Sequence, residues 1–243
     1  MIESFFLGYP VEFENICLIY PPKVKEVVGN KRFNMLAKAL TLSQEEIEDE
    51  FTREDLDLTN LPTPFEYLLG NAFNNLQFRQ AVEDAFLLFT KEKIILLFDK
   101  KEIAIGDLAT LKSIDKLRIL REENFFDFQN MVRQSLGWDP VEPPRPDEDP
   151  RVKRIKAKAR YRDYIKAKNG KQLKLVSSLA SISCMGMGLN PLNIGELSYA
   201  AIPTLIGTYQ LKEKYKIDVD SLLAGAADSK KVHPVYWIKN LDN

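Results

Sequence analysis

The chain has 243 residues and a net charge of −1, with 45% apolar and 28% charged residues. This balance is typical of a globular protein with a substantial core, and a net charge near zero argues against a dedicated nucleic-acid-binding protein. His233 is the single histidine, and Cys17 and Cys184 lie far apart in apolar surroundings. We therefore expect two buried thiols, no disulfide framework and no zinc site. The sequence contains neither an uninterrupted apolar run of about 18 residues nor a signal-like N-terminus, which predicts a soluble, intracellular chain.

Two β-hairpins are predicted in the first half of the chain. Ser4 to Phe13 and Ile16 to Tyr20 are typical of strands that turn near Glu14 and Asn15. Lys93 to Phe98 and Glu102 to Ile105 predict a second hairpin, and the two hairpins can share one sheet.

Helices are predicted between and after these hairpins. Val24 to Leu40 has helical spacing interrupted at Gly29 and Asn30, so one kinked helix or two short ones are both possible. Ser43 with Glu46 fits a capping box that opens a further acidic turn. A long apolar face predicts a helix over Phe65 to Phe89. A phenylalanine-rich stretch predicts another over Ser113 to Leu136, which Gly137 ends.

A proline-rich acidic segment divides the chain. Residues 139–150 belong to the stretch WDPVEPPRPDEDP, which holds five prolines between Pro140 and Pro150. Beyond it, helices are predicted over residues 151–168, 173–185, 194–215 and 219–227, with a kink or break around Pro203. The predicted fold class is α+β: a mixed domain at 1–138 with β-hairpins and helices, a linker at 139–150, and a basic helix followed by a small all-α domain at 151–243.

Charge is distributed unevenly along the chain. Arg151 to Lys174 holds eleven Lys or Arg against one Asp, a net charge of +10, so the rest of the chain carries −11. The most acidic run is Glu45 to Asp57, which contains eight carboxylates and one basic residue, Arg53. Its spacing fails the calcium-binding EF-hand pattern, so a solvated helix face or loop is the better interpretation.

No catalytic signature is present. The sequence lacks the P-loop, the dinucleotide-binding and the nucleophile-elbow motifs. The glycines of MGMGLNPLNIG have no strand-then-helix context, and a histidine triad would depend on His233 beside a proline in the tail. We therefore expect a protein that is not an enzyme and needs neither cofactor nor metal.

The basic helix is the strongest candidate for partner binding. Tyr161, Tyr164 and Ile165 form an i, i+3, i+4 cluster that allows docking through a narrow apolar stripe. Three interpretations stay open: an exposed, partly docked helix that keeps the protein soluble; a site for an acidic partner or for the acidic run of a second copy; and a phosphate-binding helix for nucleic acid. The candidate residues are Arg154, Lys158, Tyr161, Arg162, Tyr164 and Ile165.

The C-terminal part is richer in apolar and aromatic residues than its size requires. Tyr199, Tyr209 and Trp237 are weaker candidates for partner contact, and methionines flanked by glycine can form an adaptable surface. A plain core and a binding groove are both compatible with this composition.

The order of these features resembles a family of phage proteins from Gram-positive hosts, the tail assembly chaperones or tail components. The similar stretches are ICLIYPPKVKEVV, IILLFDKKEIAIGD, LREENFFDFQNMVRQSLG, IGELSYAAIPTLIGTYQLKEKYKIDVDSLLAGA and HPVYWIKNL. The resemblance implies an N-terminal domain that contacts tail tube subunits and a C-terminal extension that holds the long helical tape-measure protein. This chain departs from many such chaperones, which make the second part only by frameshifting.

Together with the lack of catalytic signatures, this resemblance implies a non-enzymatic phage tail assembly chaperone in the host cytoplasm that binds the tape-measure protein, the tail tube protein or both, with self-association possible. The first alternative is a structural baseplate or tail-completion subunit retained in the virion. The second is a nucleic-acid-binding module built on the basic helix.

Overall fold

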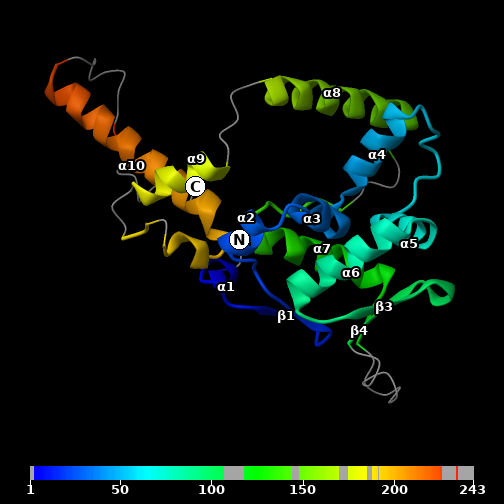
Figure 1. The fold of residues 1–243 in the computed structure, drawn as a ribbon. Coiled ribbons are helices and arrows are strands. Elements are labelled where there is room, and N and C mark those ends of the chain that lie inside the picture. The colour runs from blue at the N-terminus through cyan, green and yellow to red at the C-terminus, as the bar shows by residue number, and fades with distance from the viewer. Residues whose placement is uncertain are drawn as a thin grey trace.

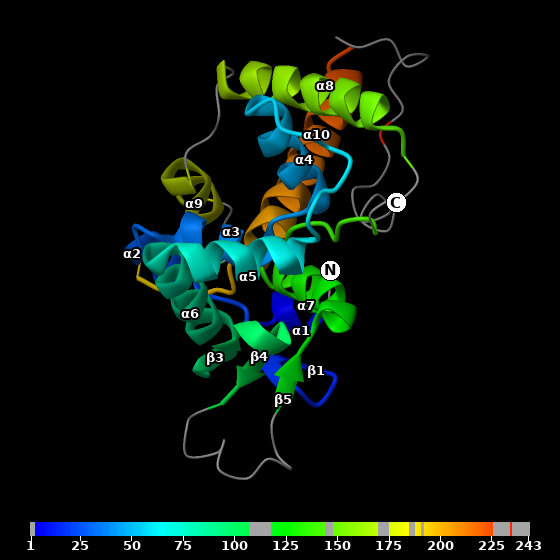
Figure 2. The same ribbon diagram turned by 90° about the vertical axis from the view of Figure 1, so that its right-hand side faces the viewer.

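The computed structural model describes residues 3–106, 118–143, 148–169, 175–184, 188–190, 192–225 and Pro234. The fold is α+β, with a body of packed helices and two small antiparallel sheets at one edge (Figures 1 and 2). The helices are α1 (Glu3–Phe6), α2 (Val24–Gly29), α3 (Phe33–Thr41), α4 (Gln44–Arg53), α5 (Pro64–Asn74), α6 (Leu76–Thr90), α7 (Glu122–Ser135), α8 (Pro150–Asn169), α9 (Leu175–Ser183) and α10 (Ala201–Leu223). The strands are β1 (Val11–Phe13), β2 (Cys17–Ile19), β3 (Ile94–Leu97), β4 (Glu102–Ile105) and β5 (Arg118–Leu120).

The first hairpin turns where the sequence predicts it. β1 pairs with β2, and Glu14 and Asn15 between them have φ angles of +44° and +58°. Such left-handed pairs form the tight turns that match the twist of a hairpin. The first strand is shorter than predicted, because α1 occupies its beginning and turns the fully buried Phe5 into the core.

The second hairpin is also confirmed, but the two hairpins do not share a sheet. β4 pairs with β3 on one side and with β5 on the other, which gives a separate three-stranded sheet. The prediction of a helix from Ser113 is wrong at Arg118–Leu120, because the fully buried Leu120 pairs there with Ile103 as strand. Residues 113–117 of that prediction lie outside the described residues, and the helix itself begins at Glu122.

Three helix predictions are sharpened by the structure. The interrupted helix at Gly29 and Asn30 is two helices, α2 and α3. The predicted helix over residues 65–89 is broken at Asn75, which ends α5 and caps α6. Pro203 does not break the helix, because it lies in the first turn of α10, where no backbone N–H is needed. α10 therefore continues to Leu223 through the segment predicted as a separate helix.

The core lies where α3, α5, α6 and α7 meet the strands, and aromatic side chains fill it. The rings of Phe86 and Phe128 stack at 5.3 Å, and Phe13 meets Phe128 edge-on at 5.6 Å. Phe65 packs against Phe125 at 5.1 Å. Because aromatic pairs contribute beyond their buried area, these contacts fix how β1, α5, α6 and α7 pack together.

The segment at residues 194–202 is hydrogen-bonded to the N-terminal part of the chain. The Val24 N–H donates to the Leu197 carbonyl at 2.9 Å, the Tyr199 N–H donates to the Pro22 carbonyl at 2.8 Å, and Ser198 Oγ donates to the Phe5 carbonyl at 2.6 Å. Gly137 passes so close that an added Cβ would lie 2.8 Å from the Ala200 carbonyl oxygen. The start of α10 is therefore held by residues that precede the linker, and the division into domains at 139–150 stays a prediction.

The two cysteines lie in different surroundings. Cys17 is buried, and burial raises the pKa of its thiol to about 12. Cys184 is exposed directly after α9, so the expectation that both thiols are buried is wrong for this residue. Among the described helices, none combines the length and the apolar character required to cross a membrane.

Candidate functional site

The basic helix α8 begins at a well-defined cap. Pro150 occupies its first position, where proline needs no hydrogen-bond partner. Asp149 before it accepts the Arg151 N–H at its carboxylate, at 2.7 Å, and the Val152 N–H at its carbonyl, at 2.9 Å. The predicted basic helix is thereby confirmed, and the end of the linker fixes where it starts.

α8 lies across α4, the helix formed by the acidic run (Figure 1). The inner face of α8, defined as Lys153, Arg154, Ala157 and Arg160, is turned toward α4 or the turn that follows it. Ala157 is the one apolar side chain that α8 buries among the described residues. α4 itself starts with the predicted capping box, in which Ser43 and Glu46 each accept a backbone N–H of the other.

Arg160 is the centre of the contact between the two helices. Its Nε and Nη2 both donate to Asp49 Oδ1, at 2.9 and 2.7 Å, and Nη2 also lies 3.3 Å from Glu48 Oε2. A third carboxylate, Glu45, is 3.5 Å from Nη1. Burial of Arg160 opposes its positive charge, but the hydrogen bonds and negative charges of these carboxylates outweigh that effect and raise the pKa of the guanidinium.

Further ion pairs extend the contact along α8. Lys153 Nζ lies 3.7 Å from Glu48 Oε1, and both side chains are largely buried. Arg154 pairs with Asp55 at 3.4 Å and donates to the Leu56 carbonyl at 3.2 Å, just beyond the end of α4. The inner face is therefore held by charge, and the acidic run that α8 meets is that of its own chain.

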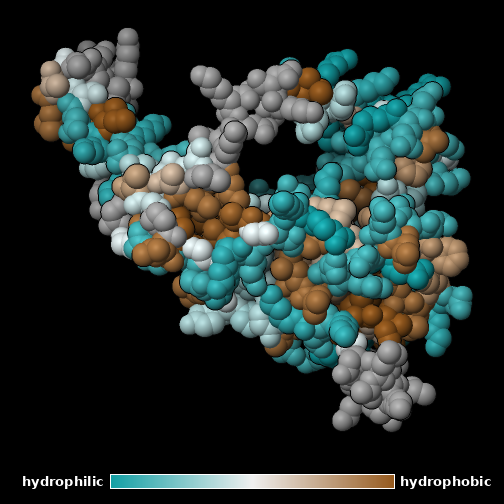
Figure 3. Space-filling view, viewed as in Figure 1, coloured by the Kyte–Doolittle hydropathy of each residue, from teal (hydrophilic) through white to brown (hydrophobic). Residues whose placement is uncertain are grey.

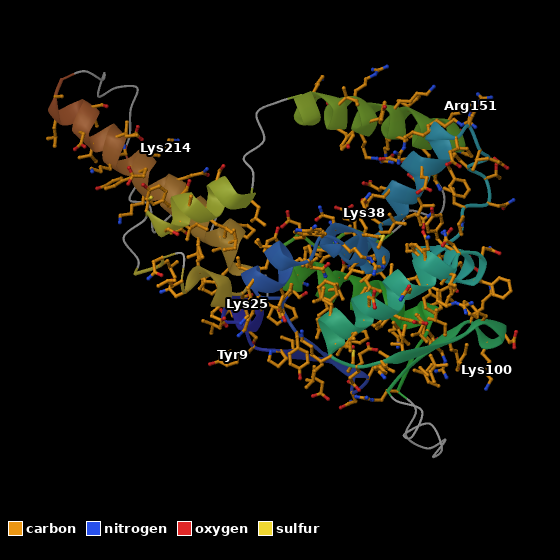
Figure 4. The ribbon with its side chains drawn as sticks, viewed as in Figure 1. Tyr9, Lys25, Lys38, Lys100, Arg151 and Lys214 are labelled. Atoms are coloured by element: carbon orange, nitrogen blue, oxygen red, sulfur yellow. The ribbon has the colours of Figure 1, made fainter. Side chains whose placement is uncertain are left out.

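The surroundings of this contact are strongly polar. Figure 3 shows a mainly hydrophilic surface over α8 and α4, and Figure 4 shows Arg151 at the end of α8 that lies beside α4. A cavity of about 470 Å³ lies where α4, the linker and α8 meet, lined by Glu45, Glu48, Glu148 and Lys156 among others. Among the residues that the structure describes, no group of His, Cys, Asp or Glu is arranged to hold a metal ion.

The outer surface of α8 carries the predicted tyrosines. Tyr161 and Tyr164 are 47% and 59% exposed, and their ring planes are inclined by 26° with centroids 6.5 Å apart. Lys158 and Arg162 beside them are exposed, and Ile165 is half-buried. The structure thus brings the predicted cluster together on one helix and leaves both tyrosine rings open to solvent.

The remaining candidates do not join this surface. Tyr199 is half-buried and packs edge-on against Phe33 with ring centroids 5.8 Å apart, and burial raises the pKa of its hydroxyl. Tyr209 is half-buried on α10, and Trp237 lies outside the described residues. Tyr199 therefore packs the segment before α10 against α3.

Of the residues that dock α8, sequence reasoning named Arg154 and missed the other three. Lys153, Ala157 and Arg160 follow one another at spacings of four and three, so they share one helix face. The signal was the small Ala157 between two cations, which lets another helix approach. A search for apolar stripes, which singled out the tyrosines, passes over such a charged face.

Comparison with family models, with curated proteins and with solved structures finds no match for this chain. The class that the fold and the site define is an α+β protein with a charged helix docked on its own acidic helix.

Proposed function

We propose that this chain is a non-enzymatic phage tail assembly chaperone that binds the tape-measure protein, the tail tube protein or both through α8. The sequence resemblance to tail assembly chaperones suggests the process. The observation that carries the proposal is the exposed, stacked pair of Tyr161 and Tyr164 on a helix that meets the body mainly through α4.

The chemistry of this surface suits a protein partner. Tyrosine and arginine are enriched at protein interfaces, since each combines apolar contact area with hydrogen-bonding groups. Tyr161 and Tyr164 stand between exposed cations such as Lys158 and Arg162. A long helix that presents apolar and acidic residues in turn would match this arrangement.

Mass spectrometry of purified virions and of infected-cell lysate separates the two tail roles. A chaperone is abundant in the lysate and missing from the particles. Stoichiometric presence in the particles would instead support a structural baseplate or tail-completion subunit, and would contradict the chaperone role.

The tyrosine pair is tested by capture of the tape-measure protein on the immobilised full chain. Tyr161→Ala with Tyr164→Ala is expected to weaken capture at least about tenfold, the effect of removing central aromatic contacts. The matched control is Tyr9→Ala, since Tyr9 is 63% exposed and lies on the opposite side of the molecule (Figure 4). Equal loss in both variants, or in neither, would refute the role of α8.

Nucleic acid is the second candidate partner of this surface, because exposed tyrosines beside cations can stack on bases. A titration of DNA with the full chain tests it. A steep fall in affinity on adding about 50 mM salt would support phosphate binding, and an unchanged affinity would end that alternative.

A further inference from the structure

The docking of α8 is unusual in how little apolar surface it uses. Only Ala157 of the inner face is buried as an apolar side chain, whereas Ile155 is 68% exposed. The contact consists mainly of ion pairs from Lys153, Arg154 and Arg160. Such ion pairs add little net stability, because the cost of taking the largely buried charges out of water offsets much of their attraction, and salt competes for the exposed pair of Arg154 with Asp55.

The other surface of α8 gains nothing from α4. Ile155, Tyr161 and Tyr164 all stay exposed while α8 is docked. A partner that offers the same carboxylates as α4 and also covers these side chains would bind α8 more tightly than α4 does. Burial of exposed aromatic and aliphatic groups would supply that advantage.

We propose that α8 is an exchangeable docking helix: α4 occupies its inner face in the free protein, and an acidic helix of a partner replaces α4. α4 displays the pattern that the partner must reproduce, with Glu45, Glu48 and Asp49 at spacings of three and one around Arg160. This inference deepens the proposed function and rests on it in one respect, that α8 is the helix that meets a partner. It adds the chemistry of that partner and the contact that competes with it.

The test uses a fluorescent peptide of residues 43–57, linked between positions 47 and 51 to hold it helical. Ile47 is fully buried against the body of the protein, so a link on its side of the helix leaves the face of Glu48 and Asp49 free. The peptide is titrated with the full chain and with a variant carrying Glu48→Lys and Asp49→Lys, in which α4 repels α8. The variant is expected to bind the peptide at least about tenfold more tightly than the unchanged chain.

Two further variants show whether binding uses the inner face. Arg160→Glu, added to the α4 variant, is expected to abolish the gain in affinity. Lys166→Glu makes the same change of charge on the exposed part of α8, outside the proposed partner-binding residues, and is expected to keep most of the gain. If the charge reversals disturb folding, as judged by circular dichroism, Glu48→Gln with Asp49→Asn tests the same gain.

Three results would overturn the inference. The first is a peptide that is bound no more tightly once α4 is altered, and the second is a loss of binding in Lys166→Glu as complete as in Arg160→Glu. Light scattering that finds a stable dimer, dissociated by Arg160→Glu, would assign the inner face to the α4 of a second copy. Because the peptide assay needs no tail protein, its failure leaves capture of the tape-measure protein standing, and failed capture leaves the exchange of helices standing.

Discussion

At the scale of single residues, Glu196 joins the two halves of the chain by charge. Its carboxylate pairs with Lys23 at 2.8 Å and with Lys25 at 2.5 Å. Hydrogen bonds from these two lysines lower the pKa of Glu196 from 4.5 to about 2. Because the folded pKa is depressed, the stabilisation is fully present above pH 4.5 and is lost as the pH falls toward about 2.

Glu196→Gln is therefore expected to reduce the acid sensitivity of folding between pH 4.5 and about 2. Thermal unfolding followed by circular dichroism across this range checks it. Removing both lysines, Lys23→Gln with Lys25→Gln, should flatten the same part of the curve. A profile that keeps its full slope without Glu196 would show that another carboxylate governs this range.

At the scale of elements, Asn75 decides that the segment from Pro64 to Thr90 is two helices. Its φ and ψ angles of −133° and 108° are extended, and its side chain accepts the Phe78 N–H at 3.1 Å. Asn75→Ala is expected to lower the free energy of unfolding by about 1 kcal/mol through loss of the cap, while Asn75→Asp should retain most of the stability. Urea unfolding measures both, and equal losses would contradict a capping role.

The sequence could predict the elements that depend on neighbouring residues, but not those that depend on contacts far along the chain. Local chemistry predicts the hairpin turn at Glu14 and Asn15 and the capping box of Ser43 and Glu46, because each depends on residues within one turn. Apolar spacing continues across Asn75 without a gap, so the break is hidden from periodicity. Likewise, Leu120 continues a helical pattern, and only its pairing with Ile103, seventeen positions away, makes it strand.

At the scale of the whole molecule, the charge pattern indicates both helices of the docking site but not their contact. The sequence identifies the acidic run and the basic helix as separate features. The contact between α4 and α8 depends on where the rest of the fold positions the start of α4. It also depends on where the linker positions Asp149, which caps α8. Opposite charges far apart in a sequence fit a partner, a second copy or the same chain equally well, and only the folded arrangement selects among them.

Docking by charge predicts that salt releases α8 from the body. Screening shortens the reach of charges from about 10 Å at 0.1 M salt to about 3 Å at 1 M. A released α8 is expected to lose helix, because most of the stability of a helix in a protein comes from its packing against the rest of the fold. Hydrogen exchange in residues 150–166, read by mass spectrometry, should therefore accelerate on going from about 0.1 M to about 1 M salt.

Charge variants separate release of α8 from general effects of salt. Arg160→Glu should exchange rapidly at both salt concentrations, because its pairs with Asp49 and Glu48 are gone. Arg162→Glu should behave like the unchanged chain, since it alters the same charge on the exposed part of the same helix. Exchange in α6, whose Phe86 and Phe89 are fully buried, should stay slow throughout. If α8 stays protected at high salt, apolar contacts rather than charge hold it, and a partner could not exchange for α4 through ion pairs.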